Sequence, residues 1–329
     1  MKYPVDPCFP RADEDVNYAG ELAKIPVRPI FIMGLHRSGT TFLYDCMAKS
    51  FPVAHLTLYH LMYFDRLLLN HHHNTEGRDK DRLNRCFKAM GITDRNIDGT
   101  TINADAVEEY GFLLRKKSGT FKLSEQNTAL FSQLCRKLIA VEPGSQAVLL
   151  KNPWDTGNAQ SILARFPEAR FVYIRREPIA VLNSMLNALL AYIEGPQKYL
   201  EMLLDTGHGR RGYRAGYCAW QILRGCRAGL GRKLTSLAAR SLLAKDLAKQ
   251  VAIYRSEIAS MPSSHAIELD YAELIADPSA AMQKLQPLLN IDLCDTPNAM
   301  TVRQRHNLNP VLENYQAQLS AMLDAAAHS

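Results

Sequence analysis

A short segment near the N-terminus restricts the possible fold more than any other. The apolar run at residues 29–33 (PIFIM) leads into a loop bracketed by Gly34 and Gly39, and then into a helix-like stretch. This order predicts a buried strand, a tight loop and a helix. Because the first backbone N–H groups of a helix have no partner within it and the helix dipole is positive there, we expect this loop to bind an anion.

Three further apolar runs show the same order of strand, turn and helix. They lie at residues 147–150, 171–174 and 266–270, and Pro278 begins a helix after the last of them. Strands that alternate with helices form parallel sheets that are covered by helices on both faces. The chain is therefore predicted to be an α/β protein with a central parallel sheet.

Long helical segments interrupt this alternation. Residues 51–144 read mostly as helix and loop, and they are too long for a simple connection, so we expect a helical insertion over about 55–144. A second helical stretch is expected over about 195–260. The predicted organisation is an N-terminal extension at 1–28, one domain at 29–295 and a C-terminal helical tail at 296–329.

The composition is that of an ordinary globular protein and narrows its partners. Hydrophobic residues make up 47% of the chain, and the net charge of +6 favours anionic partners without the dense basic face of a nucleic-acid binder. The seven cysteines include no C-x-x-C pair, which favours reduced thiols over disulfides or a zinc site. With no secretory signal and no run that could span a bilayer, we expect a cytoplasmic protein that does not bind nucleic acid.

The loop differs from a nucleoside triphosphate site at one decisive position. Gly34 and Gly39 have P-loop spacing, but Thr40 occupies the place of the P-loop lysine, and the cation is Arg37 instead. Enzymes that act on ATP or GTP need that lysine on the β- and γ-phosphates. The loop therefore predicts a different nucleotide ligand.

The ends of the following strands are also cationic. The strand at 147–150 runs into Lys151, and the strand at 171–174 runs into a pair of arginines that ends with Arg176. Asp270 offers only a weak candidate for the carboxylate that helps to hold Mg²⁺ in triphosphate enzymes. We therefore expect a nucleotide whose charge is neutralised by side chains and amides, without a metal.

Residues 31–42 (FIMGLHRSGTTF) resemble the 5′-phosphosulfate loop of the sulfotransferases that use 3′-phosphoadenosine-5′-phosphosulfate, PAPS. That loop has a Lys or Arg followed by S-G-T-T and an apolar or aromatic residue. The resemblance implies that Phe42 stacks on the adenine, as an aromatic does in some members. The implied ligands of the 5′-phosphosulfate are Arg37, Ser38, Gly39, Thr40 and Thr41.

A second segment resembles the 3′-phosphate site of the same family. That site has a strand, then R-x-P, and a serine two turns into the next helix; here the residues are Arg176, Pro178 and Ser184. Proline is tolerated in the first turn of a helix, so Arg176 should lie at a strand–helix junction with Ser184 along one helix face. An arginine can bind a terminal phosphate through two hydrogen bonds, and a serine adds a neutral donor.

Further segments extend the resemblance over roughly residues 29–60 and 104–290. Lys151-Asn152-Pro153 is similar to a K-x-P or K-x-H segment, whose lysine contacts the oxygen that bridges phosphate and sulfate. The likeness is greatest to bacterial members and to the tyrosylprotein-type branch. It implies a P-loop-like α/β fold with large helical insertions.

The catalytic base is the main departure from the family pattern. The histidine that acts as base in the cytosolic small-molecule branch falls at Pro153. In the tyrosylprotein-type branch the base is a glutamate after the loop, and the corresponding segment here contains His60. An imidazole titrates near neutrality, so His60 is the first candidate, with a structural role in a helix as the alternative. Glu109 is the second candidate, with a helix-capping role as its alternative.

These observations predict a PAPS-dependent sulfotransferase that transfers a sulfuryl group to a hydroxyl or amine by in-line displacement and releases adenosine 3′,5′-bisphosphate. Arg37 and Lys151 would supply charge at the departing oxygen. The alternatives are a Mg²⁺-dependent P-loop kinase and a non-catalytic nucleotide-binding module. We expect a small-molecule acceptor and allow for a homo-oligomer. Residues 206–245 contain Lys and Arg but no Asp or Glu, and form either a solvated face or a guide for anions.

Overall fold

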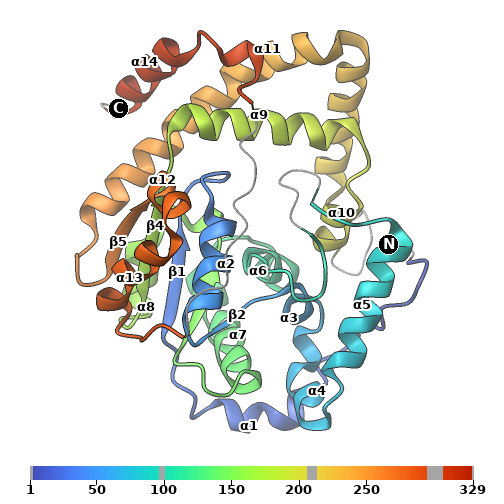
Figure 1. The fold of residues 1–329 in the computed structure, drawn as a ribbon. Helices are drawn as coiled ribbons and strands as arrows, with labels where there is room; N and C mark the ends of the chain where they lie inside the picture. The colour runs from blue at the N-terminus through green and yellow to red at the C-terminus, as the bar shows by residue number, and fades with distance from the viewer. Residues whose placement is uncertain (1–2, 96–100, 206–212, 295–306, 328–329) are drawn as a thin grey trace.

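The computed structural model describes residues 3–95, 101–205, 213–294 and 307–327. Its centre is a five-stranded sheet in the order β2-β3-β1-β4-β5, in which every neighbouring pair is parallel (Figure 1). The strands are β1 (Pro29–Met33), β2 (Val53–His55), β3 (Ala147–Lys151), β4 (Arg170–Arg175) and β5 (Ala266–Asp270). The predicted α/β class with a P-loop-like parallel sheet is confirmed.

Helices cover both faces of this sheet. The first face packs against α2 (Thr40–Ser50), α12 (Tyr271–Ala276) and α13 (Pro278–Leu289). The second face packs against a larger helical layer. The helices of this layer are α3 (Leu58–Met62), α4 (Leu67–His73), α5 (Glu76–Met90), α6 (Gly111–Ser118), α7 (Thr128–Val141), α8 (Ala159–Arg165), α9 (Pro178–Glu194), α10 (Lys198–Leu204), α11 (Arg214–Ser260) and α14 (Gln316–Ala327). A short α1 (Ala19–Leu22) precedes β1. The remaining short elements are 3-10 turns.

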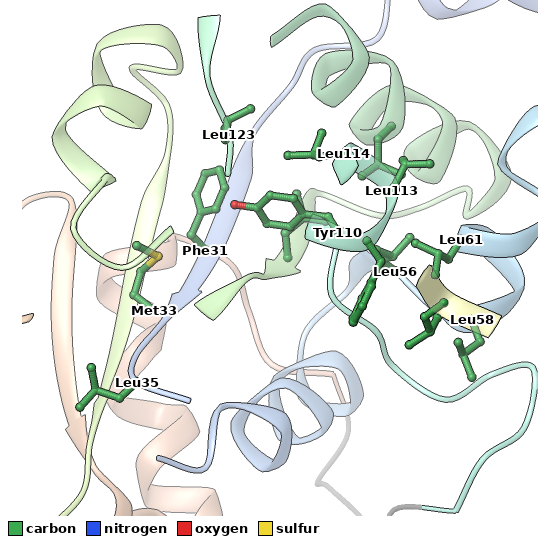
Figure 2. Packing of buried hydrophobic residues seen from close by; sticks show 14 of the residues in the cluster. Phe31, Met33, Leu35, Leu56, Leu58, Leu61, Tyr110, Leu113, Leu114 and Leu123 are labelled. Carbon is green, nitrogen blue, oxygen red and sulfur yellow. The ribbon is translucent and has the colours of Figure 1, made fainter. Parts of the chain in front are cut away.

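The apolar strands are continuous because both faces are buried. Successive side chains of a strand point to opposite faces, so Ile30 and Ile32 pack toward α2 and α13, while Phe31 and Met33 pack toward the other helical layer. Figure 2 shows the ring of Phe31 beside Tyr110, with leucines of the helical insertion farther out in the same cluster. The apolar runs in the sequence thus supply side chains to the hydrophobic core on both faces of the sheet.

The strand β2 is the one element of the sheet that the sequence analysis missed. Residues 51–144 were expected to contain helix and loop, but Val53–His55 pairs with Ala147–Leu149 of β3 at the sheet edge. Three residues are too few to show a period of two. The sheet therefore includes a segment whose residue pattern did not predict a strand.

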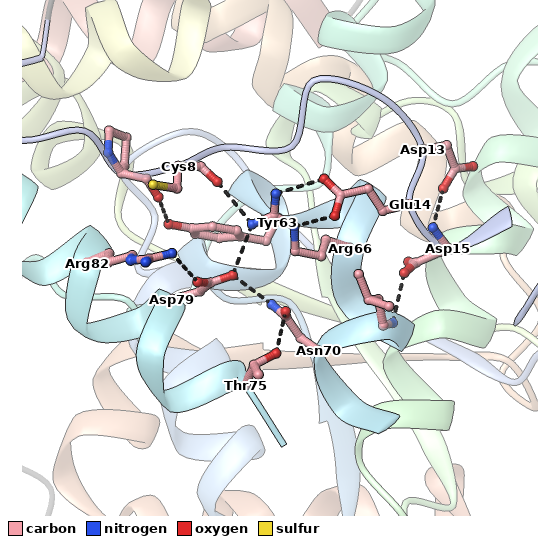
Figure 3. A network of polar contacts seen from close by, with 12 residues as sticks. Cys8, Asp13, Glu14, Asp15, Tyr63, Arg66, Asn70, Thr75, Asp79 and Arg82 are labelled. Atoms are coloured by element: carbon pink, nitrogen blue, oxygen red, sulfur yellow. Dashed lines mark hydrogen bonds and ion pairs between the residues drawn. The ribbon is translucent and has the colours of Figure 1, made fainter. Parts of the chain in front are cut away.

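Residues 3–28 are tied to the helical layer by polar contacts (Figure 3). Arg66 binds both carboxylate oxygens of Glu14 at 2.7 and 2.8 Å, and also donates to Asp79 at 3.3 Å. Lys137 is fully buried and lies 2.7 Å from Asp15, which is itself 2% exposed. Charges are rarely buried unless they are paired, so this contact fixes the N-terminal segment against α7.

The second helical stretch, expected over about 195–260, contains α10 and the long helix α11, which bends at Gly231. The helix α14, within the expected tail, packs on α11. Residues 206–212 of the basic stretch and the expected boundary at 295/296 lie outside the described residues. Over the part of the chain that the structure describes, no helix combines the length and apolarity needed to cross a bilayer.

Candidate functional site

The glycine-bracketed loop joins the carboxyl end of β1 to the first turn of α2. Gly39 has a φ of 106°, and a Cβ added there would lie 2.4 Å from the ring of Tyr271. Arg37 has a φ of 73°, which is uncommon outside glycine. The loop is thus held in a backbone conformation that leaves room for glycine alone at position 39, directly before the first turn of α2.

Hydrogen bonds within the loop and from the segments that follow β3 and β4 hold the loop in place. Ser38 Oγ donates to the carbonyl of Leu35 at 2.8 Å, and Arg176 donates to the carbonyl of Arg37 at 3.0 Å. Thr156 Oγ1 donates to the carbonyl of Gly34 at 3.0 Å. Thr156 follows β3 at the same edge of the sheet, and no motif in the sequence pointed to it. Such support fixes a binding loop before any ligand arrives.

The two predicted anion sites meet in the structure. Arg37 Nε donates to Ser184 Oγ at 3.0 Å, although the sequence analysis assigned these residues to opposite ends of a nucleotide. The guanidinium of Arg176 lies 4.4 Å from the centre of the Tyr271 ring, a cation–π contact. Arg176 comes directly after β4 and Ser184 lies in α9, as the motif predicted.

Lys151 and Glu109 form a largely buried charged pair beside the loop. Lys151 is 2% exposed, and its ammonium lies 2.8 Å from Glu109 Oε1 and 3.0 Å from Thr41 Oγ1. Burial raises the pKa of Glu109, but the charge of Lys151, together with that of His36, outweighs burial and leaves the pKa of Glu109 below its usual value. Glu109 is thus a carboxylate at neutral pH, held beside the first turn of α2.

The segment that carries Glu109 is anchored at several points. The neighbouring carboxylate of Glu108 is 2% exposed and contacts Arg95 at 3.0 Å and the hydroxyl of Tyr199. The hydroxyl of Tyr110 donates to Asp155 at 2.5 Å, just beyond β3. These contacts restrict where the Glu109 side chain can lie, because they fix the backbone on both sides of it.

His36 is a titratable group of the loop to which the sequence analysis gave no role. Its ring lies edge-on to Trp154, with 5.1 Å between ring centres. Burial lowers the pKa of His36, while the nearby charge of Glu109 acts in the opposite direction. The S-G-T-T pattern contains no histidine. The position of His36 directly before Arg37 was therefore the only feature of the sequence that could have placed it in the site.

His60 is not joined to this group of residues. It lies in α3 and is 4% exposed, and its Nδ1 lies 3.1 Å from the hydroxyl of Thr57 in a capping box. Its other ring nitrogen lies 4.0 Å from Glu142, which precedes β3. Burial, aided by His55 and Lys80, lowers the pKa of His60 to about 3, so the imidazole is neutral at cellular pH.

The remaining loop residues form the start of α2. Thr40 is buried, whereas Thr41 and Phe42 are half-buried. Phe42 packs against the core cluster between the sheet, α2 and α13, alongside Tyr271. Two aromatic side chains, Phe42 and Tyr271, therefore lie on this side of the sheet.

The arrangement combines a helix N-terminus, the cations Arg37, Lys151 and Arg176, and one carboxylate, Glu109. It can bind a ligand with more than one anionic group and can accept a proton beside it. All of these residues lie at the carboxyl ends of β1, β3 and β4, where parallel α/β sheets bind ligands. Among residues 3–95, 101–205, 213–294 and 307–327, no cluster of three or more His, Cys, Asp or Glu is arranged to hold a metal ion.

Comparisons with known proteins agree with this geometry. The model of a family described as the sulfotransferase family matches residues 29–228. The fold is similar to that of sulfotransferase STF1 from Mycobacterium tuberculosis, with 16% identity, a TM-score of 0.54, and coverage of 85% of this chain and 72% of that chain. It is also similar to sulfotransferase STF9 from Mycobacterium avium, with 14% identity, a TM-score of 0.55, and coverage of 95% and 71%. No curated protein matches the sequence.

Proposed function

The chain belongs to the sulfotransferase family, and from that premise we propose that it transfers a sulfuryl group from PAPS to a hydroxyl or amine of a small molecule. The observation that carries the proposal is the contact between Arg37 and Ser184. It joins the loop to the helix that follows the R-x-P segment, two motifs far apart in the chain, and so supports their assignment to one anion-binding site. Within the family, the loop residues 37–41 favour the branch that resembles the tyrosylprotein-type enzymes.

The residues present fit the 5′ end of such a donor. The amides at the start of α2 have no partner within the helix, and Arg37, Lys151 and the hydroxyl of Thr41 lie beside them. The ring of Tyr271 leaves no room for a Cβ at position 39, so only glycine fits there. We assign the 5′-phosphosulfate to residues 37–41, with Phe42 at the adenine.

Arg176 and Ser184 fit the 3′-phosphate. Arg176 is held over the Tyr271 ring and on the carbonyl of Arg37, so its guanidinium is oriented before a ligand binds. Ser184 supplies a hydroxyl from the first half of α9. A nucleotide with a 3′-phosphate would gain a charge-assisted hydrogen bond here that a 5′-monophosphate cannot make.

We propose Glu109, rather than His60, as the catalytic base. PAPS when bound would supply the sulfuryl group and leave as adenosine 3′,5′-bisphosphate. Lys151 lies between Glu109 and Thr41 and so can place its charge near the departing oxygen. As Lys151 shares its charge with an anion on the loop, the pKa of Glu109 would rise toward its usual value, and the carboxylate would accept the acceptor's proton more readily.

The proposal is tested by binding and turnover with the full chain. Adenosine 3′,5′-bisphosphate is compared with ATP and Mg²⁺ in a thermal-shift titration, and PAPS is then supplied with a panel of hydroxyl and amine acceptors in the presence of EDTA. We expect stabilisation by the bisphosphate and EDTA-resistant sulfuryl transfer. Stabilisation by ATP–Mg²⁺ alone would favour a kinase, and bisphosphate binding without transfer to any acceptor would favour a non-catalytic binding module.

A further inference from the structure

Asp155 is a buried carboxylate to which the proposed function assigns no role. It ends the 3-10 turn Pro153–Asp155, directly after β3, and it is fully buried. Burial raises the pKa of Asp155, whereas the hydrogen bonds that it accepts act in the opposite direction. Its two oxygens accept four hydrogen bonds, so the protein replaces the water that the carboxylate lost on burial.

One oxygen of this carboxylate joins the segments that carry the proposed base and its lysine. Asp155 Oδ2 accepts from the hydroxyl of Tyr110 at 2.5 Å and from the side-chain amide of Asn152 at 2.6 Å. Tyr110 directly follows Glu109 in the chain. Asn152 directly follows Lys151. A single oxygen atom therefore holds the chain neighbours of both members of the Glu109–Lys151 pair.

The other oxygen fixes Asp155 to the surrounding structure. Asp155 Oδ1 accepts from the backbone N–H of Leu123 at 2.9 Å and from the side-chain amide of Asn158 at 3.0 Å. Leu123 lies in the segment between α6 and α7, and Asn158 lies directly before α8. The carboxylate cannot turn away from the site without breaking hydrogen bonds at both oxygens.

The two segments that Asp155 joins are also closely packed. The backbone N–H of Tyr110 donates to the carbonyl of Lys151 at 3.4 Å. A Cβ added at Gly111 would lie 2.5 Å from Oδ1 of Asn152. Tyr110 and Asn152 are 0% and 1% exposed. Because buried side chains at this packing density transmit strain, a shift of one segment would displace the other.

We propose that Asp155 is a positioning residue that keeps Glu109 beside Lys151. It acts through the hydroxyl of Tyr110 on one side and the amide of Asn152 on the other. The inference rests on the proposed function, in which Glu109 accepts the proton. A group of an active site works only where surrounding contacts fix its position, and a displacement of about 1 Å can lower a rate by about 10²-fold.

The experiment compares two substitutions that remove the same kind of hydrogen bond. Tyr110→Phe removes the bond to Asp155, and Tyr254→Phe removes a bond of 2.8 Å to Glu268, between α11 and β5. Both tyrosines are buried, so we expect similar losses of stability. The full chain is used throughout. Single-turnover transfer from PAPS and calorimetric affinity for adenosine 3′,5′-bisphosphate are measured for each variant and for Asp155→Asn.

Tyr110→Phe should slow transfer by about tenfold, with the affinity for the bisphosphate within about twofold of the native value. Tyr254→Phe should change neither quantity. Asp155→Asn should slow transfer at least as much, because the amide that replaces one oxygen cannot accept. Circular dichroism shows which variants fold, and Tyr110→Phe decides the outcome if Asp155→Asn does not.

A double-mutant cycle separates positioning from general support of the fold. In a Glu109→Gln background, Tyr110→Phe should cost clearly less of the remaining rate than in the native chain, because part of its effect passes through that carboxylate. Equal rates in Tyr110→Phe and the native chain, equal losses in both tyrosine variants, or fully additive losses in the cycle would overturn the proposal.

Hydrogen exchange separates this proposal from the proposed function, because it needs no turnover. Amide exchange is followed by mass spectrometry in peptides that span residues 104–114 and 150–158. Tyr110→Phe should raise exchange in both peptides, and Tyr254→Phe in neither. Raised exchange in both, without transfer by the native chain to any acceptor, would reject the proposed function and keep the contacts that Asp155 makes as the link between the segments. Transfer by the native chain, with exchange and rate unchanged in Tyr110→Phe, would reject the role of Asp155 alone.

Discussion

The ammonium nitrogen of Lys151 lies 2.8 Å from a carboxylate oxygen of Glu109 at the carboxyl end of β3. Lys151 is 2% exposed and Glu109 is 13% exposed, so neither charge is well solvated. The charge of Lys151 lowers the pKa of Glu109 and so keeps it a carboxylate, and an anion on the loop would have to compete with Glu109 for the lysine. Substitution of Glu109 and of His60, one at a time, can therefore show which of the two residues is the base.

Replacement of Glu109 by Gln should slow sulfuryl transfer by about 10²- to 10⁴-fold, the usual contribution of a general base. The amide keeps the size of the side chain but cannot accept the proton. Single-turnover measurements with PAPS report the chemical step. Affinity for adenosine 3′,5′-bisphosphate, measured by calorimetry, should remain close to that of the native chain.

His60→Gln is the matched comparison for the base. We expect it to retain transfer, because the imidazole is buried against Thr57 and Glu142. Retained transfer in Glu109→Gln together with loss in His60→Gln would show that the base is His60. If both variants kept full activity while nucleotide binding held, neither residue would be the base.

Arg176→Ala should weaken binding of adenosine 3′,5′-bisphosphate by about 10- to 100-fold, the range of a hydrogen bond to a charged group. Binding of adenosine 5′-monophosphate, which has no 3′-phosphate, should fall clearly less, through loss of the hydrogen bond from Arg176 to the loop carbonyl of Arg37. Arg175→Ala is the control, because that side chain is 62% exposed and contacts Glu268 and Asp270 instead. Equal losses for both nucleotides would show that Arg176 supports the loop and does not bind the 3′-phosphate.

Gly39→Ala should destabilise the protein by about 1–3 kcal/mol and abolish nucleotide binding. The added Cβ would lie 2.4 Å from the Tyr271 ring, and the φ of 106° is unfavourable for alanine. Urea unfolding and thermal-shift titration measure the two effects. Gly20→Ala is the control, because the α1 glycine has open space around its Cα and should gain slightly in stability.

His60 and Glu142, each with a pKa shifted mainly by burial, predict two opposite pH dependences of stability. The pKa of His60 is lowered from 6.5 to about 3 by burial, so the unfolded chain binds the extra proton in that range, and stability rises with pH. Burial and the charge of Glu76 raise the pKa of Glu142 from 4.5 to about 7, so the folded chain binds the extra proton and stability falls as pH rises.

Substitution of either residue should expose the effect of the other. Relative to the native chain, Glu142→Gln should steepen the gain in stability from pH 4.5 to 6.5, and His60→Gln should turn that change toward a loss. Each group contributes at most about 1.4 kcal/mol per pH unit. Urea unfolding at several pH values measures these slopes, and identical slopes in all three proteins would contradict both assignments.

Asp15→Ala should cost about 3–5 kcal/mol of stability, because it leaves the buried ammonium of Lys137 without its carboxylate. Asp15→Ala/Lys137→Met should recover much of that loss, since no unpaired charge remains. Chemical denaturation measures both. If the double variant were no more stable than Asp15→Ala, the stability would depend on the packing of residues 3–28 and not on the pairing of the two charges.

The sequence by itself determined the features that depend on local order. The run 29–33, the glycines at 34 and 39 and the proline at 178 specify a strand, a left-handed loop position and a helix start, because each rests on the backbone preferences of neighbouring residues. The alternation of such units was sufficient to predict a parallel sheet. The edge strand β2 was missed because three residues carry too little pattern.

Only the tertiary structure decided which side chains meet. The order β2-β3-β1-β4-β5 places the ends of β3 and β4 on either side of the loop after β1, and this brings Lys151 to Thr41 and Arg176 to the carbonyl of Arg37. The same packing places Glu109 beside the loop and leaves His60 against Thr57 and Glu142. The order of strands in a sheet is set by packing between distant segments, which no local pattern encodes.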